Sequence, residues 1–198
     1  MIRRRLITTA IVTGLALITV SCAAPNESLA QQYQSGSGEG YISGDGSTVE
    51  IAVADRDDPI RYEATLDTGE TVSSSDFEGS VHVVNFWYAS CPPCRLEAPD
   101  LVDLSAEYPD VPFLGVNILD TAETSRTFAS EYGIEYPSVL DAKTAGVQLA
   151  FAGSVPPNAV PTTLVVDREG RLAARISGLV RDPSILAAMI DSVIAEDQ

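Results

Sequence analysis

The sequence predicts a single α/β domain with a mixed central sheet, and two observations carry this prediction. Apolar, β-branched segments alternate with segments whose apolar residues have helical spacing, which is typical of strands and helices that follow one another along the chain. A leader and a Gly/Ser-rich stretch precede these segments, and the remaining length, about 140 to 150 residues, suits one domain with one core.

The first half of the domain is expected to contain a hairpin, a buried strand and a helix. Residues 51–53 and 62–66 are predicted as short strands, with a turn at 67–70 and a return strand at 71–72. Residues 81–88 are apolar at nearly every position, which predicts a strand buried on both faces. Residues 95–108 carry apolar side chains along one face of a helix.

The second half repeats the alternation. Its predicted elements are a strand at 111–118, a helix at 121–132 that ends at Gly133, a short strand at 136–140, a helix at 142–151, two strands at 161–167 and 171–176, and a last helix at 182–195. Helices between strands, followed by a terminal hairpin, favour a mixed sheet flanked by helices.

Two cysteines, Cys91 and Cys94, stand between the buried strand and the first helix and are separated by two prolines. A cysteine at the first turn of a helix meets unpaired backbone N–H groups and the positive end of the helix dipole, and both stabilise the thiolate. We therefore assign Cys91 as the attacking sulfur. Cys94, nearly one turn later and expected to be more shielded, is assigned as the resolving sulfur.

Other uses of this cysteine pair are disfavoured. A zinc site normally needs four ligands, but the chain has no second C-x-x-C and only one histidine, His82. A purely structural disulfide across two residues closes too small a loop to add much stability. His82 lies in the apolar strand and is interpreted as a strand residue without a catalytic role. Neither a metal nor a cofactor is expected.

The N-terminal residues predict export and attachment to a membrane. Three arginines at positions 3–5 and an apolar run from Leu6 to Val20 form the pattern of a signal peptide. Cys22 follows a small residue, as in a bacterial lipobox, although Thr19 stands where an aliphatic residue is usual. The predicted organisation is a signal peptide over 1–21, a lipid-anchored flexible linker over 22–52 and the domain over 53–198. An uncleaved anchor and a cleaved protein with an incidental Cys22 remain alternatives.

The charge excludes one class of partner. The formal net charge is −16 at pH 7, which argues against binding to nucleic acid. It also argues against electrostatic adhesion to anionic lipid, so membrane attachment would depend on a lipid at Cys22.

The chain resembles thioredoxin-fold proteins of the TlpA/ResA type, which are membrane-tethered bacterial thiol-disulfide oxidoreductases. The matching motifs are Asn85-Phe86-Trp87, Cys91-Pro92-Pro93-Cys94, Glu97 and Pro99, and Val160-Pro161-Thr162-Thr163 followed by Asp167 and Gly170. The resemblance implies a thioredoxin fold with an N-terminal β-hairpin and a central insertion. The chain departs from the pattern at Ser90, where many relatives have an aromatic residue.

The resemblance also implies roles for three further residues. Pro161 matches a cis-proline that faces the active disulfide, where the backbone of Val160 can pair with a substrate strand. Glu97 matches an acid that can take the proton of Cys94 if burial raises its pKa. From the residues alone, Pro161 could be a trans proline at the start of an edge strand, and Glu97 would be a surface acid of the first helix.

The implied function is that of an extracytoplasmic reductase of protein disulfides, with a role in cytochrome c maturation as the commonest in the family. The implied partners are protein substrates such as an apocytochrome c and a membrane electron donor of the CcdA or DsbD type. An exported oxidase that makes disulfides remains open, because the direction depends on the relative stability of the two redox states. A copper-handling protein of the Sco type also remains, but its pattern has three residues between the cysteines and a downstream histidine. A peroxiredoxin is disfavoured because Tyr88-Ala89-Ser90-Cys91 does not supply Thr-x-x-Cys.

Overall fold

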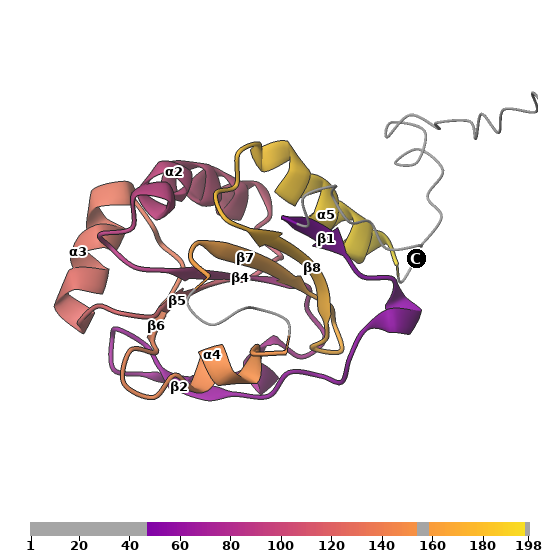
Figure 1. Cartoon of the computed structure of the whole chain (residues 1–198), viewed down its shortest axis with the longest axis horizontal. Coiled ribbons are helices and arrows are strands. Elements are labelled where there is room, and N and C mark those ends of the chain that lie inside the picture. Colours follow the sequence, from indigo (N-terminus) through magenta and orange to yellow (C-terminus); the bar gives the residue numbers. More distant parts are fainter. Residues whose placement is uncertain (1–46, 154–158, 197–198) are drawn as a thin grey trace, which may run out of the picture. The chain divides into compact units, whose positions relative to one another are not determined.

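A six-stranded mixed sheet is the centre of the fold. In the computed structural model, which describes residues 47–153 and 159–196, the strands have the order β1-β8-β7-β4-β5-β6 (Figure 1). These strands are β1 (Thr48–Glu50), β4 (His82–Trp87), β5 (Phe113–Asn117), β6 (Ser138–Leu140), β7 (Thr162–Val166) and β8 (Leu172–Ser177). Strands β4, β5 and β6 run parallel, whereas β7 is antiparallel to β4 and β8. The expected mixed sheet is confirmed.

Helices and a hairpin cover the two faces of the sheet. Helices α2 (Pro92–Glu107) and α5 (Pro183–Ala195) lie on one face, and α4 (Gly146–Ala150) lies on the other with the hairpin β2 (Glu63–Thr65) and β3 (Thr71–Ser73) (Figure 1). Helix α3 (Ala122–Tyr132) lies beside α2 (Figure 1). Between β5 and β7, the chain adds α3, β6 and α4, and β6 extends the sheet parallel to β5.

Each face of the sheet has its own apolar core. One cluster joins α2 and α5 to the sheet through residues such as Leu101, Leu186 and Ile190. The other joins the hairpin and the α4 region through Val72 and Phe151. Strand β4 lies between the two cores and all of its residues are buried, so the strand expected to be buried on both faces is confirmed.

The predicted ends of several helices are confirmed by their caps. Thr121 precedes α3 and accepts a hydrogen bond from the N–H of Thr124 at 3.3 Å. Gly133 ends the same helix with φ +73°, a conformation that favours glycine. Asp182 precedes α5 and accepts from the N–H of Ser184 at 3.0 Å. Helix α2 begins at Pro92 directly after Cys91, as expected, because proline suits the first turn of a helix.

Two predicted elements were wrong. The strand expected at 51–53 lies instead at Thr48–Glu50, where β1 pairs with β8, and Val53–Asp55 form a 3-10 turn. The helix expected at 142–151 is reduced to α4, because Ala145 has φ 51° and the helix cannot continue back through it. The Asp141 carboxylate, 3.1 Å from the N–H of Val147 and 2.8 Å from that of Gln148, fixes this later start.

Several predictions concern parts of the chain outside the described residues. These are the signal peptide, Cys22, the linker up to residue 46 and residues 154–158 of the loop before Val160. Strand β1 lies within the range expected as linker, so the fold begins slightly earlier than the predicted boundary at residue 53. Within residues 47–153 and 159–196, no helix is long and apolar enough to cross a membrane.

Candidate active site

Cys91 and Cys94 form a disulfide at the N-terminus of α2, with their Cα atoms 5.3 Å apart. Cys91 is the N-cap residue of the helix, and its Sγ accepts a hydrogen bond from the N–H of Cys94 at 3.2 Å. In the reduced protein this position exposes the Cys91 sulfur to the unpaired N–H groups and the positive end of the helix dipole. The helix start therefore favours the thiolate of Cys91, as the sequence predicts.

Burial does not distinguish the two sulfurs in the disulfide state. Cys91 is 1% exposed and Cys94 is 3% exposed, so the expectation that Cys94 is the more shielded residue is not met here. The assignment of the attacking sulfur therefore depends on its position at the helix N-terminus. It does not depend on accessibility.

An aromatic cluster packs behind the disulfide and connects it to α3. Trp87 lies at the end of β4, and the centroid of its ring is 4.4 Å from that of Phe128 in α3. Both side chains belong to the same buried cluster as Cys91 and Cys94. Phe128 in turn lies 4.5 Å from Tyr132. This cluster fixes the end of β4 from which the loop to Cys91 begins.

Gly115 leaves the space that Trp87 occupies, which gives a prediction about stability. A Cβ at this position would lie 2.3 Å from Ser138 Oγ and 2.9 Å from Trp87 Nε1, both too close without a shift. We expect Gly115→Ala to lower the free energy of unfolding by about 1–3 kcal/mol through overpacking. Thermal unfolding measures this loss. Gly153→Ala is the control, because a Cβ there meets nothing within 4 Å. Equal stability of the two variants would contradict the expected clash.

Glu97 is buried on the helix face that carries Cys94, three residues later along α2, and is 1% exposed. Its Oε1 accepts a hydrogen bond from Asn85 Nδ2 at 3.0 Å, and its Oε2 accepts from the N–H of Val180 at 3.0 Å. Glu97 is therefore not the surface acid that the residues alone would indicate.

Burial raises the pKa of Glu97 to about 7, against the lowering effect of hydrogen bonds from Val180 and Asn85; the nearby charge of Asp100 adds to the rise. The folded protein therefore holds this proton more tightly than the unfolded chain does. Stability falls as pH rises from about 4.5 through 7, because the charged form is disfavoured only in the fold. A carboxyl group that titrates near neutral pH, at the expense of stability, points to a chemical role.

The loop that precedes β7 approaches the disulfide from another side. The peptide bond between Val160 and Pro161 is cis, in agreement with the resemblance. Val160 packs against the cluster that contains both cysteines, so the structure brings this predicted binding residue to the disulfide. The carbonyl of Pro161 accepts a hydrogen bond from the N–H of Gly178 at 2.8 Å.

Two charged residues that the sequence analysis did not identify hold the loop before Cys91. Asp120 Oδ2 accepts from the N–H of Ala89 at 2.6 Å, and Arg95 Nη1 donates to the carbonyl of Ala89 at 3.4 Å. Arg95 also pairs with Glu131 and lies 5.5 Å from the ring centroid of Tyr132. Because Asp120 is far from Ala89 in sequence, its spacing gave no signal of this contact.

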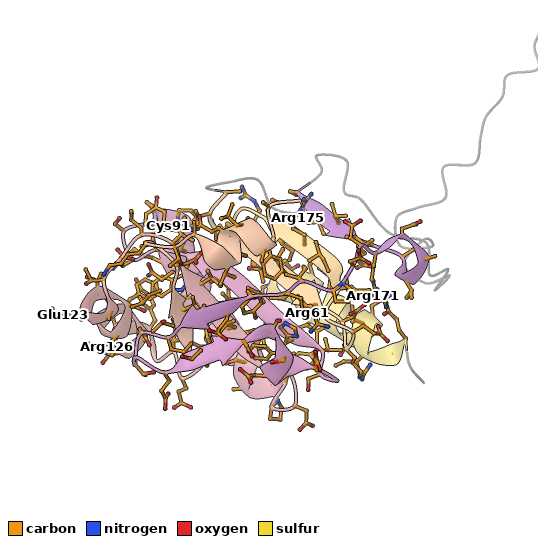
Figure 2. The ribbon with its side chains drawn as sticks, turned by 90° about the horizontal axis from the view of Figure 1, so that it is seen from below. Arg61, Cys91, Glu123, Arg126, Arg171 and Arg175 are labelled. Carbon is orange, nitrogen blue, oxygen red and sulfur yellow. A yellow bond between two sulfur atoms is a disulfide. The ribbon has the colours of Figure 1, made fainter. Side chains whose placement is uncertain are left out.

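Other residues singled out by the sequence have structural roles. Asp167 accepts from the N–H of Glu169 at 3.0 Å and of Arg171 at 2.8 Å, and so holds the turn between β7 and β8. Arg171 lies far from Cys91, toward the other end of the domain (Figure 2). The resemblance at Asp167 therefore concerns the fold.

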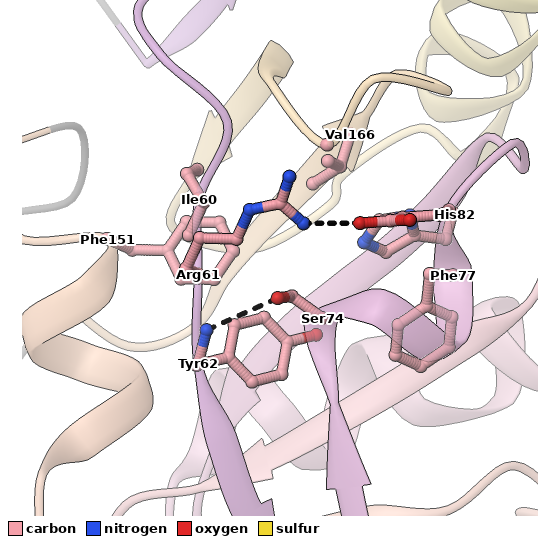
Figure 3. A pocket seen from close by; sticks show the side chains of 10 residues that line it. Ile60, Arg61, Tyr62, Ser74, Phe77, His82, Phe151 and Val166 are labelled. Carbon is pink, nitrogen blue, oxygen red and sulfur yellow. Dashed lines mark hydrogen bonds and ion pairs between the residues drawn. The ribbon is translucent and has the colours of Figure 1, made fainter.

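His82 lines a small pocket under the hairpin, which has space for about one water molecule (Figure 3). Its ring stacks on Phe77 at 4.7 Å, and burial lowers its pKa to about 4, so it is neutral at pH 7. The Tyr62 hydroxyl is buried there without a hydrogen-bond partner within the part of the chain that the structure describes. The cysteines do not line this pocket, in keeping with a structural role for His82.

The profile of the AhpC/TSA family matches residues 57–175, which include the disulfide, Glu97 and the cis-proline. The chain belongs to the AhpC/TSA family. Within this family, the resemblance to thiol-disulfide oxidoreductases of the ResA type and the thioredoxin fold are both confirmed by individual relatives and solved structures.

Two relatives and one solved structure show the activity. The chain is 29% identical to the thiol:disulfide interchange protein HelX of Rhodobacter capsulatus, over 80% of this chain and 88% of that protein. It is 32% identical to a thiol:disulfide interchange protein DsbE homologue of Paracoccus denitrificans, over 74% of this chain and 79% of that protein. A secreted thiol-disulfide isomerase from Corynebacterium glutamicum superposes with a TM-score of 0.68 and 29% identity, over 78% of this chain and 96% of that one. This member of the AhpC/TSA family is therefore a thiol-disulfide oxidoreductase.

Proposed function

We propose that the protein reduces disulfides of protein substrates outside the cytoplasm, with Cys91 as the attacking and Cys94 as the resolving sulfur. The observation that carries the proposal is the position of Cys91 at the N-terminus of α2, where its sulfur accepts a hydrogen bond from the N–H of Cys94. This environment stabilises a thiolate, which is the nucleophile in disulfide exchange.

The reaction proceeds in two displacements. The Cys91 thiolate attacks a substrate disulfide, so that a mixed disulfide forms and one substrate sulfur leaves as a thiolate. Cys94 then loses its proton to Glu97 and attacks the Sγ of Cys91. The Cys91–Cys94 disulfide forms and the second substrate sulfur leaves, so that two electrons have passed to the substrate. The backbone of Val160, beside Pro161, would hold the substrate chain next to the disulfide.

The resemblance to the TlpA/ResA type points to an apocytochrome c as substrate and to a membrane protein of the CcdA or DsbD type as the donor that restores the dithiol.

The reduction potential decides between reductase and oxidase. For a reductase we expect a value near that of thioredoxin, about −270 mV, whereas a strong oxidase such as DsbA lies near −120 mV. The measurement equilibrates the purified domain in glutathione buffers of known ratio, followed by alkylation and mass spectrometry. A potential near the oxidase value would replace the proposed direction by the formation of disulfides.

Export and lipid attachment at Cys22 complete the proposal. The similarity to a secreted thiol-disulfide isomerase supports export, together with the leader of arginines and apolar residues. We expect Cys22→Ala to abolish palmitate labelling, because the variant lacks the thiol that would carry the lipid. The double variant Cys91→Ser/Cys94→Ser is the control and should label normally. Labelling that persists in Cys22→Ala would remove the anchor from the proposal.

A further inference from the structure

The two oxygens of Glu97 have partners of different kinds. Oε2 accepts from the backbone N–H of Val180, a group that can only donate. Oε1 faces the side-chain amide of Asn85, which contains both a donor and an acceptor. When Glu97 carries a proton, that proton therefore has a matching partner only on Oε1.

The Asn85 amide has a second partner on the neighbouring strand. Asn85 of β4 and Thr163 of β7 are directly opposite in the sheet, and Asn85 Nδ2 donates to Thr163 Oγ1 at 3.0 Å as well as to Glu97. Both N–H bonds of the amide are thus used when Glu97 is ionised. The hydroxyl of Thr163 accepts here, but a hydroxyl can also donate.

We propose that Asn85 and Thr163 are positioning residues that keep Glu97 Oε1 hydrogen-bonded whether or not it carries a proton. When Glu97 takes the proton, the Asn85 amide turns over about its Cβ–Cγ bond. Its oxygen then accepts from the O–H of Glu97 and from the hydroxyl of Thr163, which changes from acceptor to donor. The two ends of an amide have nearly the same shape, so the surrounding core need not move. The inference rests on the proposed role of Glu97 as proton acceptor.

The other groups around Glu97 do not offer this exchange of roles. Asp100 lies on the same helix, and its charge adds to the rise in the pKa of Glu97. Tyr136 precedes β6; burial and the charge of Glu97 raise its pKa far above 7. Among the residues that the structure describes, its hydroxyl makes no hydrogen bond to Glu97, whose two oxygens bond Asn85 and Val180. Cys94 is in the disulfide in the oxidised protein. Asn85 and Thr163 are uncharged, and both can change between donating and accepting a hydrogen bond. They are therefore the groups in the sheet that can match both protonation states of Glu97.

The test follows the titration of Glu97 in the oxidised protein by NMR of ¹³C-labelled carboxyl groups. In Thr163→Val, the ionised state leaves one amide N–H of Asn85 without a partner, whereas the protonated state only leaves the amide oxygen with one partner fewer. An unsatisfied N–H is the more costly defect, so we expect the pKa of Glu97 to rise by about one unit, a tenfold change in the ionisation constant. Thr163→Ser keeps the hydroxyl and should restore the wild-type titration.

Ser125→Ala is the matched control for stability. Its buried hydroxyl donates to Asp67 at 2.7 Å, so this variant also loses a buried side-chain hydrogen bond. It should lower the unfolding temperature while the pKa of Glu97 stays unchanged. A Thr163→Val variant that lowers stability without moving the titration of Glu97 would reduce Thr163 to a structural residue and overturn the proposal.

Asn85→Asp is a second variant that tests the coupling between residue 85 and Glu97 if Thr163→Val does not fold. Two adjacent carboxyl groups share one proton, so we expect two separated titrations, one above and one below the wild-type value. A single titration at the wild-type position would overturn the proposal. The oxidised protein has no active-site thiol to titrate, so this result is independent of the reaction. Failure of the proposed function would appear instead as full exchange activity in Glu97→Gln, while Thr163→Val still shifts the titration of Glu97.

Discussion

Cys91→Ser is expected to abolish exchange with protein disulfides. A serine hydroxyl is not ionised near neutral pH, even at the N-terminus of α2, so the variant has no nucleophile for the first displacement. The measurement is the reduction of insulin, or of a peptide with a C-x-x-C-H disulfide, by the reduced protein. We expect turnover to fall to the uncatalysed rate, while the far-UV circular dichroism spectrum stays that of the wild type.

Cys94→Ser is the matched partner of that variant. It retains the attacking sulfur but not the resolving one, so the first displacement proceeds and the second cannot. We expect a mixed disulfide between Cys91 and the substrate to accumulate, visible as a mass increase that is lost on reduction. Trapping in the native host would then identify the bound substrates. If Cys91→Ser were the variant that trapped the substrate, the two roles would have to be exchanged.

The order of the elements could be predicted because each one has a local signal. The run that became β4 is apolar at nearly every position, which favours burial on both faces. Thr121 and Gly133 mark the two ends of α3 through their own backbone preferences. The position of Cys91 at the start of α2 follows from the prolines beside it. These features do not depend on contacts with distant parts of the chain.

The missed or displaced elements depend on contacts that no local pattern contains. Strand β1 exists because Thr48–Glu50 pair with β8, more than a hundred residues later along the chain. The loss of the first turn of the helix expected at 142–151 depends on Asp141 and on the backbone of Ala145. Short strands and short helices have weak intrinsic preferences, so such tertiary contacts determine where they begin.

Within the active site, Glu97 also combines a feature that local sequence predicts with contacts that it does not. Its spacing from Cys94 places both on one face of α2, and this was visible in the sequence. Its burial was implied only by the resemblance, because a lone acid on a helix of this kind is more often exposed. Asn85, which donates to Glu97, and Thr163, which accepts from Asn85, are 78 residues apart and meet through the register of β4 and β7. Asn85 and Thr163 each stood in a motif of the resemblance, but nothing in the sequence linked one motif to the other.

Glu97→Gln is expected to slow the resolving step by about 10²- to 10⁴-fold, the usual contribution of a positioned general base. Glutamine has nearly the same shape and keeps polar contacts to Asn85 and Val180, but it cannot take a proton from Cys94. In the wild type the step should accelerate as pH rises through about 7, where Glu97 loses its own proton and becomes able to accept one. In the variant this inflection should be absent, with a rise only as the Cys94 thiol ionises by itself near its ordinary pKa of about 8.5.

The pH–rate profile, obtained by acid quench and mass spectrometry of the mixed disulfide, separates two effects of opposite sign. Removing the negative charge of Glu97 lowers the pKa of Cys94, which alone would speed its attack, whereas removing the proton acceptor slows it. Asp100→Asn is the control: it removes a neighbouring charge that raises the pKa of Glu97, so it should move the inflection to lower pH without changing the plateau rate. A Glu97→Gln variant that kept both the plateau and the inflection near 7 would assign the proton of Cys94 to another group.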